Sequence, residues 1–342
     1  MKILLVNKYL YRKGGAETYF IKLGEYLKSL GNEVEYFGMA DERNCVGNRV
    51  EAYTENIDFH KKSLKHITYP FKIIYSVNAR KQIRKVLSNF KPDVVHLNNF
   101  NYQLTPSIIY EIKKHNIPIV YTAHDVQLVC PNHKLKNDYT DGLCRKCDGG
   151  KYFECVKNNC VHSSKIRSIL GAVEAWYYKL RHTYKMIDLT VCPSEFMEKE
   201  ISRNDDINGR TVTMYNFIDE IKPLGAECEN YVLYFGRYSE EKGISNLVKA
   251  AKKLSNIPFV FAGKGELENE VNSADNIKNV GFKTGDELRN IIEKALFTVL
   301  PAEWSENCPF SVMESQSLMT PVLGAKIGGI PELIDDGKTG IL

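Results

Sequence analysis

Two positively charged side chains stand where a strand pattern gives way to a helix pattern in the second half of the chain. Arg237 follows the apolar segment 231–236, and Lys242 precedes Gly243 and the next helix pattern. A guanidinium offers a forked pair of N–H donors and an ammonium a point cation, so together they could bind a diphosphate. Cations on loops are often only solvated. The position of Arg237 and Lys242 at the end of a strand is what favours the binding of a diphosphate.

Two carboxylates, Glu306 and Glu314, lie eight positions apart further along the chain. The apolar segment 297–301 before them predicts a strand, and Pro309 suits the first position of the next helix. Glu306 is therefore expected on a strand-to-helix loop and Glu314 in the second helical turn. Ligands bind at this edge of an open α/β sheet, although glutamates at this spacing are also frequent on solvated helix faces.

The first half of the chain contains two further candidates. Gly14 and Gly15 lie between the first strand pattern and the first helix pattern, where backbone N–H groups and the helix dipole could bind an anion. Their spacing is not that of G-x-G-x-x-G, which disfavours a nicotinamide or flavin cofactor. His124 follows the strand pattern 118–123 and could hydrogen-bond a hydroxyl group or a developing charge. A plain turn and a structural histidine are the simpler interpretations.

Five of the nine cysteines are concentrated between residues 130 and 160, in a segment rich in polar residues. In the cytoplasm such a cluster favours a metal over disulfides, and four thiolates could hold zinc and order a loop that lacks its own apolar core. A single C-x2-C pair leaves free thiols or a disulfide as alternatives. The five are Cys130, Cys144, Cys147, Cys155 and Cys160.

The scaffold for these residues is predicted from strand and helix patterns that alternate along the whole chain, which is typical of parallel sheets with crossover helices. The aperiodic segment 217–230 predicts a linker between two doubly wound Rossmann-like domains, 1–216 and 217–342, that face each other across a cleft. The chain ends at Gly340-Ile-Leu342, after a strand pattern, so we expect a shortened form without the final helices. Strands are expected at 2–7, 33–38, 94–98, 118–123, 189–193, 211–216, 231–236, 258–263, 279–282, 297–301 and 321–324.

Charge is distributed unevenly between the two halves. Residues 1–216 contain 33 Lys and Arg against 23 Asp and Glu, whereas residues 217–342 contain 13 against 19. A basic first half favours an anionic partner, and because no nucleic-acid-binding motif is present we expect a membrane face or a phosphate-bearing lipid. No apolar run approaches the roughly 18 residues of a membrane-spanning helix, and the N-terminus does not resemble a signal peptide, so we expect a cytoplasmic protein.

The segment 164–182 predicts a helix with a broad apolar stripe and basic residues beside it. This stripe could pack on the sheet of its own domain, or it could bind a membrane surface or a lipid-linked acceptor. The stripe comprises Ile166, Ile169, Leu170, Val173, Trp176, Tyr177 and Leu180, and the basic residues are Lys165, Arg167, Lys179 and Arg181.

These motifs, in this order, resemble those of the retaining glycosyltransferases of family 4, which have the GT-B fold and transfer a sugar from a nucleotide-sugar donor. The resemblance covers nearly the whole chain. It is carried by Gly14-Gly15-Ala-Glu17, Ala123-His124-Asp125, Gly236-Arg237 with Lys242-Gly243, and Glu306 with Glu314.

The resemblance implies a role for each matching position. Glu306 and His124 would contact the transferred sugar as catalytic residues, and Glu314 would bind the donor ribose. Fixed cations and a helix dipole would neutralise the leaving group, so no divalent ion would be required. The diphosphate would be held by Arg237, Lys242, Gly14, Gly15 and the helix start at Cys308, Pro309 and Phe310, although many members carry a glycine where Cys308 stands.

A subgroup from bacterial surface-polysaccharide pathways is similar in its cysteines as well. It shares a Cys-Pro-Asn, C-x2-C and Cys arrangement that matches Cys130, Cys144, Cys147 and Cys160, which would be the four ligands of a structural zinc. The implied activity is transfer of a hexose to a growing, lipid-linked saccharide at the inner face of the plasma membrane. The alternative is a catalytically inactive, metal-ordered protein that binds glycans or nucleotides on the same scaffold. A sugar phosphorylase would need a pyridoxal phosphate lysine, for which we see no motif.

Overall fold

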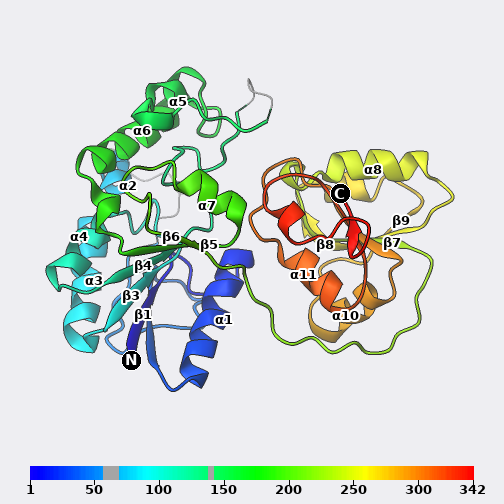
Figure 1. Ribbon diagram of the computed structural model, residues 1–342, viewed down its shortest axis with the longest axis horizontal. Helices are drawn as coiled ribbons and strands as arrows, with labels where there is room; N and C mark the ends of the chain where they lie inside the picture. Colours follow the sequence, from blue (N-terminus) through cyan, green and yellow to red (C-terminus); the bar gives the residue numbers. More distant parts are fainter. Residues whose placement is uncertain (57–68, 138–141) are drawn as a thin grey trace. The chain divides into compact units, whose positions relative to one another are not determined.

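The computed structural model describes residues 1–56, 69–137 and 142–342. The chain divides into two compact units, Met1–Met214 and Tyr215–Leu342 (Figure 1). Residues 215–230, at the start of the second unit, have no regular secondary structure. Each unit contains one six-stranded sheet, and every paired strand runs parallel to its neighbour. The predicted class of two α/β domains with parallel sheets is therefore confirmed.

The sheet of the N-terminal unit has the strand order β2-β1-β3-β4-β5-β6. Both of its faces are buried, because Ile3 and Leu5 of the first strand belong to one apolar core while Leu4 and Val6 belong to another. Burial on both faces is why β1 is continuously apolar from Ile3 to Val6 rather than alternating. The strands are β1 Lys2–Val6, β2 Glu33–Phe37, β3 Val94–Leu97, β4 Ile119–Thr122, β5 Leu189–Cys192 and β6 Thr211–Thr213.

The helices of this unit include the expected helix after the first strand. It ends where predicted, with Leu30 as its C-cap and Gly31 at a φ of 81°, a conformation that glycine adopts without strain. The helices are α1 Gly15–Ser29, α2 Tyr69–Ile74, α3 Val77–Phe90, α4 Ser107–Lys114, α5 Phe153–Lys157, α6 Lys165–Leu180 and α7 Glu195–Ile201.

The apolar stripe predicted for the segment 164–182 does not form the buried face of α6. Ile166 and Leu180 are 72% and 80% exposed, and three more of its seven side chains are also exposed. The face that is buried instead carries Ser168, Ala172 and Tyr178. Packing of this stripe on the domain's own sheet, the simpler of the two interpretations, is therefore wrong.

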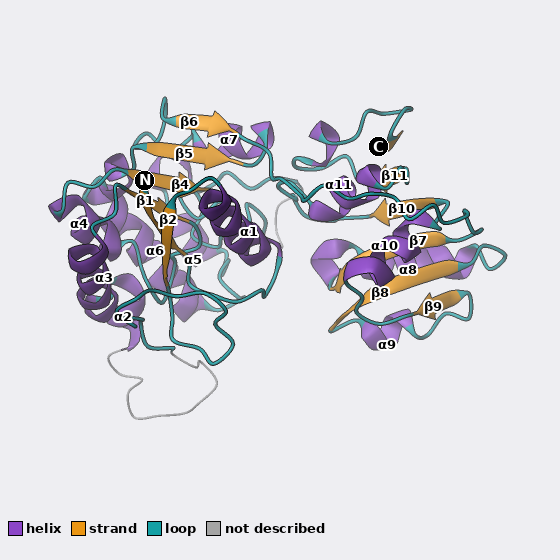
Figure 2. Ribbon diagram, turned by 90° about the horizontal axis from the view of Figure 1, so that it is seen from below, coloured by secondary structure: helices purple, strands orange, loops and turns teal. Residues whose placement is uncertain are grey.

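The sheet of the C-terminal unit has the order β12-β11-β10-β7-β8-β9, drawn as adjacent arrows in Figure 2. The predicted strand 279–282 is misplaced: the strand is Ile277–Asn279, because Gly281 turns the chain at a φ of 69° and Phe282 is exposed. The strands are β7 Val232–Tyr238, β8 Phe259–Gly265, β9 Ile277–Asn279, β10 Phe297–Leu300, β11 Val322–Gly324 and β12 Gly340–Ile341, and the helices are α8 Ile244–Lys253, α9 Glu268–Val271, α10 Gly285–Glu293 and α11 Phe310–Ser317.

Strand order reverses once in each sheet. In the N-terminal unit β1 lies between β2 and β3, and in the C-terminal unit β7 lies between β8 and β10. At such a reversal the two adjacent strands send their connections to opposite sides of the sheet, which leaves a crevice at their carboxyl ends where ligands bind. Strand β7 ends with Arg237 and Tyr238, and the loops after β7 and β10 contain Lys242 and Glu306. Topology therefore brings these predicted site residues to one edge of the sheet.

A buried ion pair stabilises the N-terminal unit and should make its stability depend on pH. Glu111 of α4 is 2% exposed, and its carboxylate lies 2.6 Å from Arg84 Nε and 2.7 Å from Arg80 Nη2. The hydrogen bonds from Arg84 and Arg80 lower the pKa of Glu111 from 4.5 to about 2 although burial raises it. The carboxylate therefore stabilises the fold above pH 4.5 and loses this effect as the pH falls toward 2.

We expect Glu111→Gln to lower the free energy of unfolding by about 3 kcal/mol at neutral pH, because two guanidinium groups lose their counter-charge. The difference from wild type should shrink as the pH is lowered below 4.5. Denaturant unfolding at a series of pH values measures both effects. Glu33→Gln, which alters an exposed carboxylate beside Arg49, is the control, and equal losses in the two variants would contradict the prediction.

Candidate functional site

The loop after β7 approaches the loop after β10 very closely. Lys242 ends a 3₁₀ turn, and Gly243 starts α8 with a φ of 74°. A Cβ atom on Gly243 would lie 1.8 Å from the carbonyl oxygen of Pro301, the residue that follows β10. Glycine is therefore required here for two reasons, the left-handed backbone and the missing side chain.

This approach brings two of the predicted site residues into contact. Lys242 Nζ donates a hydrogen bond to Glu306 Oε1 at 2.5 Å, and the two side chains are only 24% and 17% exposed. Arg237 does not join them, because its side chain is 67% exposed and its Nη1 lies 3.7 Å from Glu241 Oε1. The structure thus shows a cation and a carboxylate held together at the strand reversal, with a second, exposed cation near the end of β7.

The backbone of Glu306 is held by a segment that the sequence pattern did not indicate. Its carbonyl oxygen accepts a hydrogen bond of 2.8 Å from the Gly329 N–H, and a Cβ atom on Gly328 would lie 2.2 Å from the same oxygen. These two glycines therefore fix the position of the Glu306 backbone. Their only signal in the sequence is the Gly-Gly pair before Ile330.

Helix α11 follows this loop, but it starts one residue later than predicted. Pro309 is its N-cap, with an extended backbone at φ −69° and ψ 125°, and the first helical residue is Phe310. The side chain of Pro309 itself makes no capping hydrogen bond, and the positive end of the helix dipole favours an anion near the first N–H groups. Glu314 lies in the second turn, as predicted.

Cys308, just before this helix, is buried, and burial raises the pKa of its thiol to about 11. Its carbonyl oxygen accepts a hydrogen bond of 2.9 Å from Asn216 Nδ2.

In the N-terminal unit the glycine pair stands at a helix start, as predicted. Gly14 is the N-cap of α1, and its carbonyl oxygen accepts hydrogen bonds from both the N–H and the hydroxyl of Thr18. Glu17 is buried in the first turn, where a carboxylate interacts favourably with the positive end of the helix dipole. The carboxylate also means that this helix start already has a negative group close to it.

His124 lies at the carboxyl end of β4 in a mostly apolar setting. Its Nε2 is 2.8 Å from Asn98 Oδ1, and its ring meets that of Tyr19 edge to face at 5.2 Å between centroids. Burial lowers the pKa of His124 to about 4, and it also lowers that of His96 to about 4, with a smaller contribution from His124. Both imidazoles are neutral at pH 7, so His124 can act there as a hydrogen-bonding group rather than as a cation.

A polar network beside His124 was not predicted. His133 Nδ1 lies 3.3 Å from Asp125 Oδ2 and 3.0 Å from Asn101 Nδ2, and Asn101 Oδ1 accepts a hydrogen bond of 3.0 Å from Lys8. The ring of Tyr102 stacks on His133, with 5.4 Å between centroids and 9° between planes. The network links the ends of β1, β3 and β4 to residues 130–160, the cysteine-rich insertion, because His133 comes three residues after Cys130.

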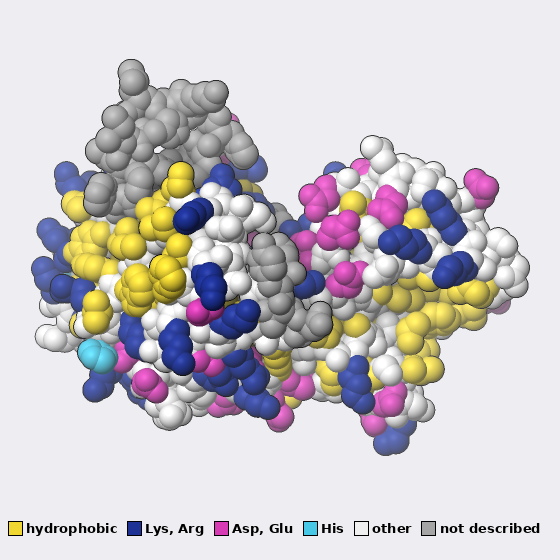
Figure 3. Space-filling model, turned by 90° about the horizontal axis from the view of Figure 1, so that it is seen from above, with side chains coloured by type: hydrophobic (Ala, Val, Ile, Leu, Met, Phe, Trp, Pro, Cys, Tyr) yellow, Lys and Arg dark blue, Asp and Glu magenta, His cyan; other side chains and the backbone are white. Residues whose placement is uncertain are grey.

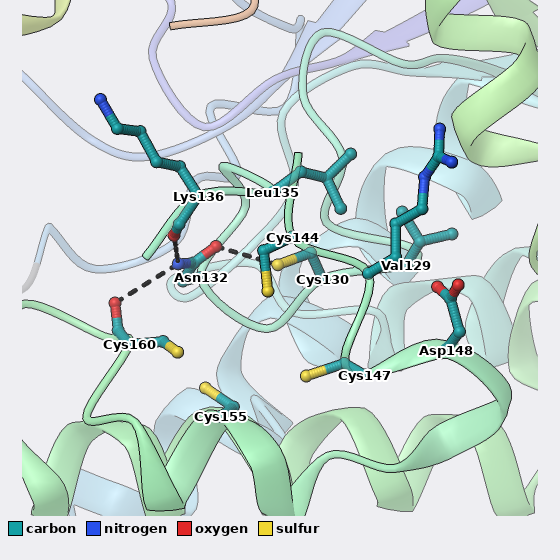
Figure 4. Close-up of a pocket in the computed structure, with 11 residues that line it drawn as sticks. Val129, Cys130, Asn132, Leu135, Lys136, Cys144, Cys147, Asp148, Cys155 and Cys160 are labelled. Atoms are coloured by element: carbon teal, nitrogen blue, oxygen red, sulfur yellow. Dashed lines mark hydrogen bonds between the residues drawn. The ribbon is translucent and has the colours of Figure 1, made fainter. Parts of the chain in front are cut away.

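All five cysteines of the insertion line one small cavity (Figure 4). Burial and, to a smaller extent, three neighbouring cysteines raise the pKa of the Cys147 thiol to about 12. The three are Cys130, Cys160 and Cys144. Within the described ranges, no three His, Cys, Asp or Glu side chains are yet grouped tightly enough to hold a metal ion. The structure thus gathers the thiols without drawing them to a single point.

Comparison with known proteins gives this architecture a family. Residues 13–221, more than half of the chain, match the family described as Glycosyltransferase Family 4, and residues 217–342 match the one described as Glycosyl transferases group 1. The chain therefore belongs to Glycosyltransferase Family 4, and it is a glycosyltransferase of the GT-B fold.

Individual relatives are distant but match along the whole chain. An uncharacterized 42.6 kDa protein in the cps region of Klebsiella pneumoniae is 26% identical, over 97% of this chain and 87% of that protein. An uncharacterized glycosyltransferase of Methanocaldococcus jannaschii is 21% identical, over 100% of this chain and 84% of that protein. The crystal structure of Anabaena HepE in complex with UDP superposes with a TM-score of 0.66 at 17% identity, over 100% of this chain and 85% of that chain.

The close approach at Gly243 leads to a test. We expect Gly243→Ala to lower the free energy of unfolding by several kcal/mol and to displace Lys242. The new methyl group would clash with the Pro301 carbonyl, and alanine is strained at this positive φ. Gly337→Ala is the matched control, since Gly337 has a φ of 80° but no atom within 4 Å of the added carbon, and it should cost only about 1 kcal/mol. Denaturant unfolding measures both, and similar losses would show that the contact with Pro301 is unimportant.

Proposed function

We propose that this glycosyltransferase moves a hexose, with retention of configuration, from a nucleotide diphosphate sugar to a growing, lipid-linked saccharide in surface-polysaccharide synthesis. The observation that carries the proposal is the contact between Lys242 and Glu306 at the strand reversal of the C-terminal unit. Support also comes from the Klebsiella relative in the cps region and from HepE, which has been crystallised with UDP-glucose.

The cations and the helix start would bind the donor diphosphate. Lys242 would exchange its contact with Glu306 for a phosphate oxygen, and Arg237, exposed near the end of β7, would turn inward to bind a second one. The N-terminal N–H groups of α11 would bind the same charge. Because fixed positive groups would stabilise the departing nucleotide diphosphate, we propose that transfer requires no divalent ion.

The carboxylates would bind the sugar parts of the donor. Once Lys242 binds phosphate, Glu306 would accept hydrogen bonds from the hexose hydroxyls, and Glu314, one turn into α11, would accept one from the ribose. In the N-terminal unit we assign His124 to a hydroxyl of the transferred sugar and Gly14-Gly15 to a phosphate oxygen. A neutral His124 suits this role because it can donate or accept a hydrogen bond without adding a charge.

The exposed stripe of α6 supports contact with a membrane surface. Its exposed members are spaced three and four residues apart, so they lie on one side of the helix, and basic residues accompany them. Figure 3 shows hydrophobic side chains gathered on a face of the N-terminal unit with lysines and arginines around them. We propose that this face contacts anionic lipid at the cytoplasmic side of the membrane, where a lipid-linked acceptor would be found. In the described part of the chain, no helix has the length and apolarity needed to span a bilayer. The exposed members are Ile166, Ile169, Val173, Trp176 and Leu180.

Transfer assays on point variants test the donor site, with the donor chosen by a thermal-shift screen of nucleotide sugars that begins with UDP-glucose. We expect Lys242→Ala and Glu306→Ala each to lower kcat/KM about 100-fold, because each removes a charge placed for the transition state. Lys294→Ala, which breaks an ion pair with Glu229 in the same unit, should leave kcat/KM unchanged. Full activity in both site variants would refute the site, and donor binding without turnover in the wild type would favour the inactive alternative.

Vesicle co-sedimentation tests the membrane face. We expect Ile166→Asp with Leu180→Asp to weaken binding to phosphatidylglycerol vesicles about tenfold or more, because two apolar side chains become charged. Leu224→Asp with Met319→Asp, two exposed positions of the C-terminal unit, should have no effect. The proposal fails if binding is insensitive both to the α6 substitutions and to charge reversal at Lys165, Arg167, Lys179 and Arg181.

A further inference from the structure

The loop that joins β1 to α1 is held between the loops that follow the two neighbouring strands. The N–H of Lys8 donates to the Asn99 carbonyl oxygen at 2.7 Å, and the Lys8 carbonyl oxygen accepts from the N–H of Met39 at 3.0 Å. The N–H of Cys45 donates to the Leu10 carbonyl oxygen at 3.0 Å. Because strand order reverses at β1, these three loops border the edge at which a doubly wound sheet binds its ligands.

Two tyrosine rings and three cations gather on these loops. Lys13 Nζ lies 3.7 Å from the centroid of the Tyr9 ring, and Lys8 Nζ lies 5.5 Å from the same centroid. The Tyr9 ring meets that of Tyr11 edge to face, with 5.6 Å between centroids. The guanidinium carbon of Arg43 lies 4.2 Å from the Tyr11 centroid. These five residues, three of them basic, form the cation–tyrosine cluster.

The cations of this cluster differ in how their charge is balanced. Arg43 donates to the Asp41 carboxylate from Nε and from Nη2, each at 2.8 Å. In the described part of the chain, neither Lys8 nor Lys13 has a carboxylate oxygen within 4.0 Å. A ring face attracts an ammonium group but carries no net charge. The two lysines therefore keep a positive charge that an anionic ligand could bind, whereas the charge of Arg43 is already neutralised.

Lys8 also joins the cluster to the polar network beside His124. Its Nζ donates to Asn101 Oδ1 at 3.0 Å and lies 5.8 Å from the centroid of the Tyr102 ring. Tyr102 and His133 both have a φ of 62°, a strained backbone conformation that is often found at functional sites. An amide, an imidazole and ring faces thus lie beside the free charge, and such groups suit a ligand that also carries hydroxyl groups.

We propose that Lys8 and Lys13 bind an anionic group of the saccharide acceptor, either the carboxylate of an acidic sugar or a phosphate. The two ammonium groups would turn from the Tyr9 ring to the anion, and Asn101 would bind a hydroxyl group of the same sugar. This inference rests on the proposed function for the acceptor being a saccharide, and it adds that the acceptor carries negative charge near the bound sugar. The excess of basic residues in 1–216 would favour the same charge at longer range.

Binding of three small saccharides to the unaltered full chain tests the charge of the ligand. We expect methyl β-D-glucuronide or glucose 6-phosphate to bind about tenfold more tightly than methyl β-D-glucoside, because charge-assisted hydrogen bonds are stronger than neutral ones. NMR titration measures the three dissociation constants. Preference for the glucuronide alone indicates an acidic sugar, and preference for the phosphate alone indicates a phosphate group. Equal affinity for all three, or no binding of either anionic probe, would overturn the proposal.

Substitutions then locate the bound anion. Lys8→Ala with Lys13→Ala should remove the preference for the anionic probe, whereas Lys8→Arg with Lys13→Arg should keep part of it because the charge is retained. Lys85→Ala with Lys114→Ala, at exposed positions of α3 and α4, is the control with the same change in net charge. A preference lost in Lys242→Ala but kept in the double alanine variant would place the anion at the donor site and refute the assignment. These titrations need neither donor nor turnover, so a failure of the proposed transfer reaction would be seen separately.

Discussion

The C-terminal unit depends on the close approach of two loops at the reversal of strand order. Parallel strands place their carboxyl ends at one edge, but this alone does not make two side chains touch. Contact requires the turn before α8 to pass against the Pro301 carbonyl, which only a residue without a side chain permits. Gly243 meets this requirement, and the ion pair between Lys242 and Glu306 follows from it.

This ion pair keeps two charged groups half-buried in a ligand-free protein. Each neutralises the other, which lowers the cost of removing them from water. A ligand that brings phosphate to Lys242 and hydroxyl groups to Glu306 would replace one set of charge-assisted contacts with another. In the proposed function, ligand binding would therefore rearrange existing partners rather than create buried charge.

The N-terminal unit uses a different chemistry at the corresponding edge of its sheet. His96 and His124 are neutral at pH 7 because burial lowers the pKa of each imidazole, and Asp125 and Asn101 are linked through His133 to the cysteine-rich insertion. The insertion lies beside α6, with Trp176 Nε1 donating to the Gly150 carbonyl oxygen at 3.0 Å.

The sequence by itself determined the fold class, the end of α1, the placement of Glu306 and Glu314, and the placement of Arg237 and Lys242 near one strand end. These features follow from local rules: apolar runs for buried parallel strands, a glycine after a helix, and a loop after each strand. Periodicity could not place β9, because Gly281 turns the chain before Phe282. It also could not show that the α6 stripe faces outward, because a helix with apolar residues on several sides can bury any one of those sides.

Only the tertiary structure decided which side chains meet. Lys242 contacts Glu306 whereas Arg237 contacts Glu241, Pro309 is a cap rather than the first helical residue, and His133 joins Asp125 across eight residues of chain. Five cysteines scattered over three segments face one cavity. The physical reason is the same in each case: a contact between distant residues depends on how strands are ordered and how loops pack, and sequence spacing records neither.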